Sequence, residues 1–572
     1  MTLTSVPTDQ DRKMFDSAIA ELAGGESAWA GMSLTERADL LGRVHEAVAA
    51  SAESWVGTAS SVKGLDPDSQ LVGEEWISGP NPVLSACAVL AESLRALAQK
   101  KSPLEGVKFG TAPGGRVSVP VLPHSAYESI LLHGFKAEVW MPPGVAASTV
   151  RSHAGLAAHR PSLTHGVGLV LGAGNITSIP PLDVLYELIA NNRLTLLKLN
   201  PVMSRMKAVY EKALAPLIAA NLLRIVDGDG ADGGYLAHHR GISHVHMTGS
   251  AATHDAVVYG PGPEGQARKA ANTPLLNKPI TSELGGVSPI IVVPGRWTAR
   301  DLRYQAEHIA TMRLHNGGYN CIAGQVVLMS RDWNQKGAFL EELRAAMTRT
   351  PERTPWYPGS GDRVASACES YPGAEQVGTG RLLIELTAAD NAQTMQTTEY
   401  FSPVLGVMEL AGSGRAFLDA AISAANQDFV GTLGANVIAD PKDIKSMGKG
   451  FRTSIAQLHY GTIAVNAWTG VGFLTAAAPW GAFPGHMLED VQSGLGVVHN
   501  ALLISEPERT VVTGPFRPFP RSVAHGEFAL FPKPPWFVTS RSAKATGRLL
   551  SKFAAKPSWA RMPAVFAAAF RA

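Results

Sequence analysis

Residues 166–199 read GVGLVLGAGNITSIPPLDVLYELIANNRLTLLKL and contain two apolar strand patterns separated by a helical one. Residues 167–171 form an unbroken apolar run, which is typical of a strand buried on both faces of a parallel sheet. Residues 182–191 have the composition of a helix, and residues 194–199 form the next strand. This order predicts a β-α-β unit of a doubly wound α/β sheet.

Strands and helices continue to alternate after residue 199, both before and after residue 283. The expected elements are a helix over 204–221, strands over 222–226 and 243–247, a second series with strands over 289–293 and 325–330, and a helix over 301–314 between them. Amphipathic helices over 33–60 and 83–98 precede the first sheet. The chain is therefore expected to be an α/β protein with two doubly wound domains, which place ligands at the carboxyl ends of their strands.

Composition limits the class of protein. A chain of 572 residues with 45% hydrophobic and 17% charged residues is expected to fold into two or three domains. A net charge of +2 gives no argument for nucleic acid binding. Three scattered cysteines make neither a disulfide framework nor a zinc site, and the histidines lack ligand spacing, so no metal is expected. The sequence has no secretion signal and no run of about 18 apolar residues, so we expect a cytoplasmic protein.

Two short motifs carry the chemistry. ELGGVSP, residues 283–289, begins with a carboxylate, and NGGYNCIAGQ, residues 316–325, places Cys321 among small residues. A thiol nucleophile and a carboxylate base are the minimum equipment for thioester chemistry. Each residue also has an ordinary explanation when taken alone: Cys321 as a small buried hydrophobe, and Glu283 as a carboxylate at a strand end.

Asn175 follows the first apolar strand in the segment GAGNIT. Its amide is suited to donate to a developing oxyanion, or alternatively to cap the next helix. The glycines of this segment lack the third glycine of a dinucleotide fingerprint. The glycine pair that begins at Gly285 permits close backbone contact with a flat ligand.

These motifs, in this order, resemble those of the aldehyde dehydrogenase superfamily, and the resemblance spans roughly residues 30–500. It implies an aldehyde dehydrogenase-like fold with two doubly wound α/β domains and an oligomerisation arm. It also implies roles for three residues: Cys321 as nucleophile, Glu283 as the base that activates water, and Asn175 as oxyanion donor.

The resemblance further implies a cofactor site for NAD or NADP. Its expected residues are Lys198 in LLKLNP, Gly249 and Ser250 in TGS, Gly285, and Glu399 and Phe401 in EYFSPV. Family members that prefer NAD commonly have a glutamate three residues after the lysine. This chain has Pro201 there, so the choice between NAD and NADP stays open.

The resemblance implies a division of the chain into three parts. Residues 1–282 are expected to form the cofactor domain, with an arm excursion at about 134–165, and residues 283–480 the catalytic domain. Residues 481–572 are expected to return to the cofactor domain and oligomerisation arm and to end in a basic extension. Because relatives assemble by sheet extension across subunits, a homo-oligomer, dimer or tetramer, is expected.

The C-terminal tail lies outside the usual length of the family. Residues 530–572 carry eight Lys or Arg and no Asp or Glu. A basic amphipathic helix is expected around Lys544, Arg548 and Lys552, with Leu549, Leu550 and Phe553 on its apolar face. Two interpretations remain open: peripheral contact with a membrane surface, or a structural arm whose aromatic residues fill grooves of a neighbouring subunit.

The expected function is NAD(P)-dependent oxidation of an aldehyde to a carboxylic acid through a cysteine thiohemiacetal and a thioester. Relatives that pass the acyl group to coenzyme A often lack the glutamate, so Glu283 favours hydrolysis. Two alternatives remain: a CoA-linked acyl reductase, that is, an acylating aldehyde dehydrogenase, and a catalytically silent cofactor-binding scaffold.

Overall fold

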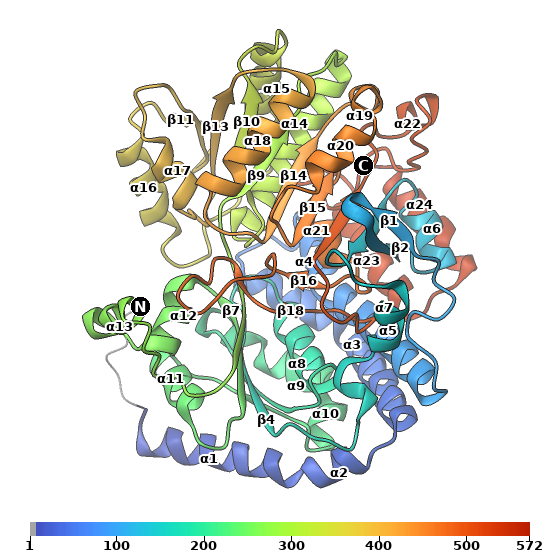
Figure 1. Ribbon diagram of the computed structural model, residues 1–572, viewed down its shortest axis with the longest axis vertical. Helices are drawn as coiled ribbons and strands as arrows, with labels where there is room; N and C mark the ends of the chain where they lie inside the picture. The colour runs from blue at the N-terminus through green and yellow to red at the C-terminus, as the bar shows by residue number, and fades with distance from the viewer. Residues whose placement is uncertain (1–6) are drawn as a thin grey trace.

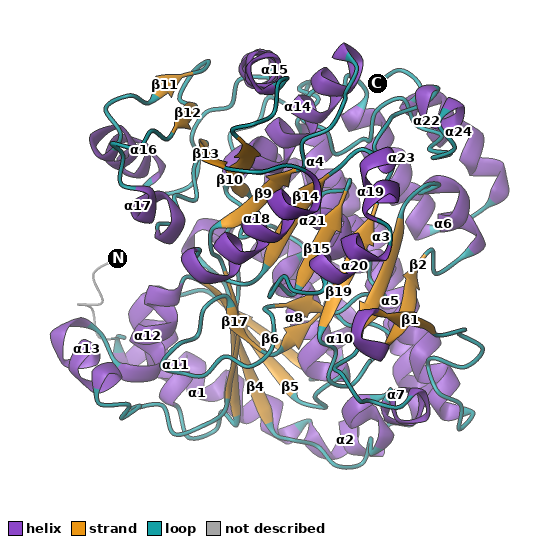
Figure 2. Ribbon diagram, turned by 45° about the horizontal axis from the view of Figure 1, so that its top comes forward, coloured by secondary structure: helices purple, strands orange, loops and turns teal. Residues whose placement is uncertain are grey.

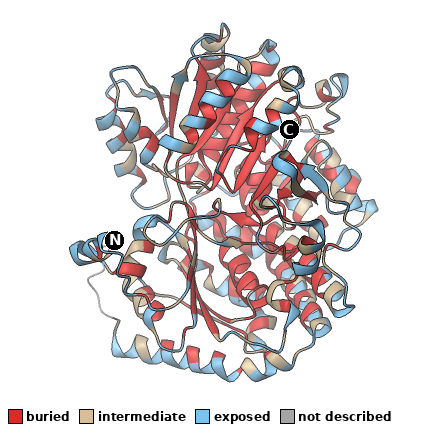
Figure 3. Ribbon diagram, in the orientation of Figure 1, coloured by how far each residue is buried: buried red, intermediate tan, exposed pale blue. Residues whose placement is uncertain are grey.

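The computed structural model describes residues 7–572 and contains two large sheets, one in the lower and one in the upper half of Figure 1. Residues 1–6, part of the segment in which no secretion signal is expected, lie outside the described residues. No helix within residues 7–572 is both long and apolar enough to cross a membrane. Buried residues concentrate in the two sheets and in the helix faces that cover them (Figure 3).

The six-stranded sheet has the order β17-β8-β7-β4-β5-β6. Its parallel strands are β4 (Val167–Leu171), β5 (Leu194–Lys198), β6 (Leu223–Val226), β7 (His244–Gly249) and β8 (Ile280–Leu284), and β17 (Gly494–Leu495) pairs with β8 in the antiparallel direction. Helix α8 (Ile179–Ile189) connects β4 to β5. The β-α-β unit expected from residues 166–199 is confirmed.

The larger sheet has eleven strands in the order β1-β2-β3-β19-β15-β14-β9-β10-β13-β12-β11. Its central parallel strands are β9 (Ser288–Val292), β10 (Gly324–Ser330), β13 (Val404–Leu410), β12 (Leu382–Glu385), β14 (Gly434–Ile438) and β15 (Thr462–Val465). Helix α14 (Ala299–Leu314) lies between β9 and β10 in the chain. Glu283 lies in β8, so the chain crosses from one sheet to the other at residues 285–287.

The segment expected as an arm extends the larger sheet of its own chain. Strand β3 (Lys136–Trp140) pairs with β19 (Arg509–Thr513), and β19 pairs with β15 in parallel. Strands β2 (Arg116–Leu122) and β1 (Gly110–Ala112) continue the sheet beyond β3. Figure 2 shows them on the same side of the molecule as β15 and β19. The other edge is β11 (Glu375–Gln376).

Helix α3 (Leu34–Val62) begins with a capping box between Ser33 and Glu36 and packs against α4 (Val72–Ser78) and α5 (Pro80–Ala98). Helix α1 (Asp9–Gly24) packs instead against β4, β5 and β6, and α2 (Glu26–Gly31) follows it in the chain. Elsewhere the chain forms α6 (Ala126–Leu131), α7 (Ala147–His153), α9 (Lys207–Ala213), α10 (Ala215–Ala219), α11 (Gly230–His238), α12 (Ala251–Tyr259), α13 (Gly262–Ala270), α15 (Lys336–Arg349), α16 (Ser360–Ser370), α17 (Ala392–Thr397), α18 (Gly414–Asp428), α19 (Pro441–Met447), α20 (Lys449–Ile455), α21 (Thr469–Leu474), and the short pair β16 (Trp480–Gly481) and β18 (Val497–Val498).

The C-terminal tail folds onto its own chain. It contains α22 (Arg521–Ala524), α23 (Ala543–Ala555) and α24 (Met562–Ala569), and α23 packs against α4. The expected basic helix is present, but Phe553 is buried with Leu131, Met562 and Val565. Because this apolar face is covered within the chain, the structure does not support a membrane contact through it. The aromatic residues Trp536 and Phe537 are likewise buried in the same chain rather than left for a neighbour.

Candidate active site

A pocket brings together segments that are far apart in the sequence. Its walls come from α4, the loop after β4, the loop between α14 and β10, and α21 with the residues that follow it. The lining residues are Ile77, Ser78, Asn175, Ile176, Ile179, His315, Asn320, Cys321, Ile322, Trp468, Gly470, Phe473, Leu474 and Trp480. Cys321 and Asn175 therefore share one cavity, and no Asp, Glu, Lys or Arg is among the described residues that line it.

The loop that carries Cys321 has an unusual backbone. Asn316, Gly317 and Gly318 have φ angles of 56°, 72° and 82°, so three consecutive residues adopt the left-handed region. Glycine enters this region at little cost, and asparagine does so more readily than most other residues. The small residues that mark this motif in the sequence are thus required for the shape of the loop.

Side-chain amides tie this loop to the loop after β4. Asn175 donates from Nδ2 to the Tyr319 carbonyl oxygen at 2.9 Å. Asn316 donates from its own Nδ2 to the carbonyl oxygens of Asn175, at 3.2 Å, and Tyr319, at 3.1 Å. One donor hydrogen of the Asn175 amide remains available to a ligand, because the NH₂ group has two.

Glu283 and Cys321 influence each other electrostatically. Glu283 is 1% exposed at the carboxyl end of β8, and burial raises the pKa of its carboxyl group to about 7. Burial and the charge of Glu283 raise the pKa of the Cys321 thiol well above its usual range. The proton shared between Cys321 and Glu283 therefore resides on the sulfur. An ionised Glu283 is the nearby group able to accept it.

A buried ionic network contacts the Cys321 loop through Asn316. Lys63 Nζ donates to Glu75 Oε1 at 2.8 Å and to Asn316 Oδ1 at 3.0 Å, and the Lys63 and Glu75 side chains are both fully buried. Glu74 Oε2 accepts from the Asn316 N–H at 3.1 Å and from Arg353 Nη1 at 2.6 Å. Sequence reasoning missed this network. The available signal was two adjacent carboxylates within the otherwise apolar segment 71–77.

Behind Glu283, two buried histidines contact the same buried carboxylate, Asp183. His246 Nε2 is 3.6 Å from Asp183 Oδ2, and His499 Nε2 is 3.1 Å from Asp183 Oδ1. Burial lowers the pKa of His246, but the charge of Asp183, its hydrogen bond and the charges of Glu187 and Glu283 together raise it, and the net shift is upward. Within residues 7–572, no group of three His, Cys, Asp or Glu side chains is arranged to hold a metal.

The proposed cofactor residues of the first sheet lie at its carboxyl edge. In the pairing register, Lys198 is opposite Leu171, which is opposite Met247, and Gly249 is opposite Leu284. Ser250 caps α12, its Oγ accepting the Thr253 N–H at 3.2 Å. Ligands of open parallel sheets bind at this edge.

Lys198 faces an acidic turn. Burial lowers the pKa of its ammonium group to about 8, and the negative charges of Asp232, Asp229 and Asp227 oppose this shift. Lys207 pairs with Asp227 at 3.0 Å. Lys198 is thus a buried cation that lies within the electrostatic influence of three carboxylates.

Glu399 lies directly against Gly285. A Cβ atom on Gly285 would be 2.0 Å from Glu399 Oε1, so only glycine allows this approach. Burial raises the pKa of Glu399 to about 7, and its Oε1 has no hydrogen-bond partner among the described residues. Phe401, with a φ of 42°, packs on Tyr357 with ring centroids 4.9 Å apart. An unpartnered buried carboxylate oxygen beside a glycine pair fits a ligand hydroxyl group.

Comparison with known proteins gives a family match over part of the chain and several similar folds. The model of the aldehyde dehydrogenase family matches residues 195–359, which include Lys198, Glu283 and Cys321. The fold resembles γ-glutamyl-γ-aminobutyraldehyde dehydrogenase from Burkholderia cenocepacia J2315, with 20% identity, a TM-score of 0.55, and coverage of 87% of this chain and 88% of that one. It also resembles an aldehyde dehydrogenase from Mycobacterium tuberculosis solved with NAD⁺, with 17% identity, a TM-score of 0.55, and coverage of 87% and 89%.

The two Rossmann-like sheets and the loops between them define an aldehyde dehydrogenase fold. Together with the match of residues 195–359 to the family model, this fold makes the chain similar to aldehyde dehydrogenases.

Proposed function

We propose that this protein oxidises an aldehyde to a carboxylic acid through a covalent intermediate on Cys321. The observation that carries the proposal is the shared apolar pocket of Cys321 and Asn175, with the Glu283 carboxylate acting electrostatically on the thiol. A nucleophile, a carboxylate base and an amide donor are the groups that acyl chemistry on a thiol requires.

In the proposed mechanism, Glu283 takes the thiol proton and the Cys321 sulfur attacks the carbonyl carbon. The Asn175 amide and the Cys321 N–H donate to the resulting oxyanion. A nicotinamide held by the cofactor residues would accept the hydride, which would leave a thioester on Cys321. Glu283 releases the first proton to solvent and then removes a proton from water as the water attacks this thioester. The carbon–sulfur bond breaks, the carboxylic acid departs and the thiol is regenerated.

We propose that Lys198 and the Gly249–Ser250 turn bind the adenosine and phosphate groups of the cofactor. We propose that Glu399, with Phe401 and Gly285 beside it, binds the nicotinamide ribose. We further propose that NAD is preferred to NADP. The support is electrostatic: Asp227, Asp229 and Asp232 act on Lys198, and their charges would repel a 2′-phosphate. An indole-3-acetaldehyde dehydrogenase of similar fold, 18% identical, was solved with NAD⁺.

The pocket lining supports an uncharged, apolar aldehyde. Trp468, Phe473 and Trp480 supply aromatic surface, and Ile77 and Ile179 supply aliphatic surface. A charged substrate would have to leave water without a partner, which costs several kcal/mol or more. The uncharged polar residues of the wall are Ser78, Asn175, His315 and Asn320.

For the domain organisation, we propose that the unit around the six-stranded sheet is the cofactor domain and the unit around the eleven-stranded sheet the catalytic domain. We also keep the proposal of a homo-oligomer, dimer or tetramer, on the strength of the family. Because β19 of the same chain covers β15, assembly would use another surface. Light scattering on the purified protein measures the state directly.

The deciding experiment follows reduced nicotinamide absorbance with a panel of aldehydes, with NAD or NADP, and with or without coenzyme A. The Cys321→Ala variant runs beside the natural chain. We expect reduction that is independent of coenzyme A and absent in the variant. Dependence on coenzyme A would instead establish the acylating reaction, and silence despite measured cofactor binding would establish a scaffold.

A further inference from the structure

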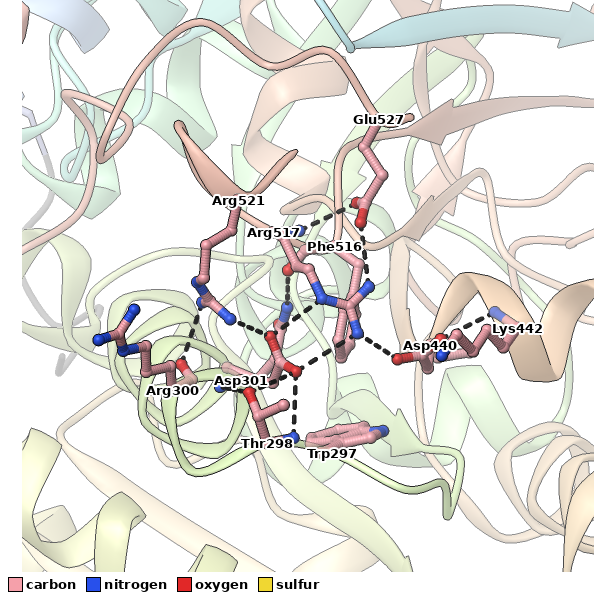
Figure 4. Close-up of polar contacts among 12 residues, drawn as sticks. Trp297, Thr298, Arg300, Asp301, Asp440, Lys442, Phe516, Arg517, Arg521 and Glu527 are labelled. Carbon is pink, nitrogen blue, oxygen red and sulfur yellow. Dashed lines mark hydrogen bonds and ion pairs between the residues drawn. The ribbon is translucent and has the colours of Figure 1, made fainter. Parts of the chain in front are cut away.

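The C-terminal tail, residues 515–572, begins at a buried ionic cluster. Figure 4 shows the Arg517 guanidinium among three carboxylates: Nε is 3.1 Å from Asp301, Nη1 is 3.1 Å from Glu527, and Nη2 pairs with Asp440. Arg521 also pairs with Asp301. Asp301 lies in the first turn of α14, so this cluster fixes the start of the tail to the helix that leads into the nucleophile loop.

The tail then follows α14. Gln305 donates from Nε2 to the Phe516 carbonyl oxygen at 2.6 Å. The Phe537 ring stacks on Tyr304 and His308, with centroid distances of 5.4 and 5.2 Å. Lys533 pairs with Glu307 at 2.8 Å. These contacts cover successive turns of α14 up to the turn before His315.

The end of the tail packs closely against α4. A Cβ atom on Gly73 would be 2.4 Å from the Ala543 carbonyl carbon, and one on Gly547 would be 2.9 Å from Trp76 Cβ and 3.0 Å from the Gly73 oxygen. Ser551 Oγ donates to the Trp76 carbonyl oxygen at 3.0 Å. Two glycines therefore allow α23 and α4 to approach backbone to backbone.

Helix α4 has two functions at the site. Ile77 and Ser78 line the pocket beside Cys321. Glu74 and Glu75 hold the nucleophile loop, directly and through Lys63, at Asn316. Every residue of α4 is buried, so a displacement of the helix must move these groups.

We propose that the C-terminal tail is a positioning element of the active site: by clamping α4 through α23, it sets the width of the aldehyde pocket at Ile77 and the position of the Cys321 loop. The part of the inference that concerns aldehyde selectivity rests on the proposed function. The part that concerns the reactivity of the Cys321 thiol does not. Helix α23 packs on the side of α4 that carries Trp76. A larger side chain at this contact therefore displaces Ile77 and lowers the rate of oxidation of bulky aldehydes.

The test compares full-length Gly547→Ala, which adds one methyl group at the contact, with Gly57→Ala in α3, where a Cβ meets no atom within 4 Å. We expect Gly547→Ala to lower kcat/KM about tenfold for long-chain or branched aldehydes and less than about twofold for acetaldehyde. Gly57→Ala should match the natural chain. Ser551→Ala, which adds no volume, provides a second variant if Gly547→Ala does not fold.

The second readout is alkylation by iodoacetamide, followed by peptide mapping. Cys368 is exposed and serves as the internal reference in each sample, while Cys87 is buried. We expect the Cys321 to Cys368 rate ratio to change at least about threefold in Gly547→Ala and Ser551→Ala but not in Gly57→Ala.

Equal losses for all aldehydes, or an unchanged rate ratio in a folded variant, would overturn the inference. If the natural chain oxidises no aldehyde, the proposed function fails, and the alkylation ratio still decides whether the tail positions the loop.

Discussion

Asn175 donates its side-chain amide to the Tyr319 carbonyl oxygen at 2.9 Å, which joins the proposed oxyanion donor to the loop of the proposed nucleophile. The two residues are 144 positions apart, and their loops adjoin strands of different sheets, β4 and β10. The bond orients the amide plane in the wall of the pocket, so the second amide hydrogen is directed before a substrate arrives. Such preorganised donors account for a large share of catalysis in acyl chemistry.

Asn175→Ala should lower kcat by about 10²–10³-fold, the usual effect of removing one oxyanion donor. KM and cofactor binding should change little, because the amide acts mainly on charge that develops during the reaction. Steady-state kinetics and a cofactor titration measure both quantities. A change confined to KM would remove Asn175 from the oxyanion site.

Glu283→Gln should slow the burst of reduced cofactor and lose steady-state turnover, because Glu283 both accepts the thiol proton and activates water for hydrolysis. The burst is measured by rapid mixing at pH 8. In the natural chain, turnover should rise with pH through about 7, because the carboxylate must be ionised to act as a base. A burst at the natural rate with turnover lost would show that Glu283 acts in hydrolysis alone.

The raised pKa of Glu283 also predicts a pH dependence of stability. The ordinary pKa is 4.5 and the folded value is about 7, so the folded protein retains a proton that the unfolded chain has released. The stability that this retained proton contributes is fully present below about pH 4.5 and is lost as pH rises through 7. Glu283→Gln should therefore raise the unfolding free energy by roughly 1–3 kcal/mol at pH 8 and little at pH 5. Denaturant titrations at both pH values test this, and an equal gain at both would contradict it.

Lys63→Met should destabilise the protein by about 3–5 kcal/mol, because it leaves Glu75 buried without its cation. It should also change Cys321 alkylation, since Asn316 loses its contact with Lys63. The double variant Lys63→Met/Glu75→Leu should recover most of the stability but not the alkylation rate. Arg95→Met, which breaks an exposed pair with Asp39, is the matched control and should cost less than about 1 kcal/mol.

Asp227→Asn should raise kcat/KM with NADP about fivefold relative to NAD, which corresponds to about 1 kcal/mol of relieved repulsion. Asp39→Asn removes the same charge from α3 and should leave the ratio unchanged. If both variants shift the ratio alike, the effect comes from net charge and not from the acidic turn beside Lys198.

The strands and helices around Glu283 and Cys321 were predictable from the sequence because their signals are local. Apolar runs marked β4 and β5, and glycines next to Asn316 marked a loop that needs left-handed backbone. The order of the motifs also indicated the superfamily. Each of these features is contained within a few consecutive residues.

What the sequence by itself determined is therefore the alternation of elements, the glycine-rich loop before Cys321 and the resemblance of the motifs to aldehyde dehydrogenases. Only the tertiary structure decided that β3 and β19 extend the chain's own sheet, that Lys63 reaches Asn316 across 253 positions, and that α23 clamps α4. The physical reason is that such contacts depend on shape and burial between distant segments. A buried lysine or a contact glycine has the same local pattern as one on the surface.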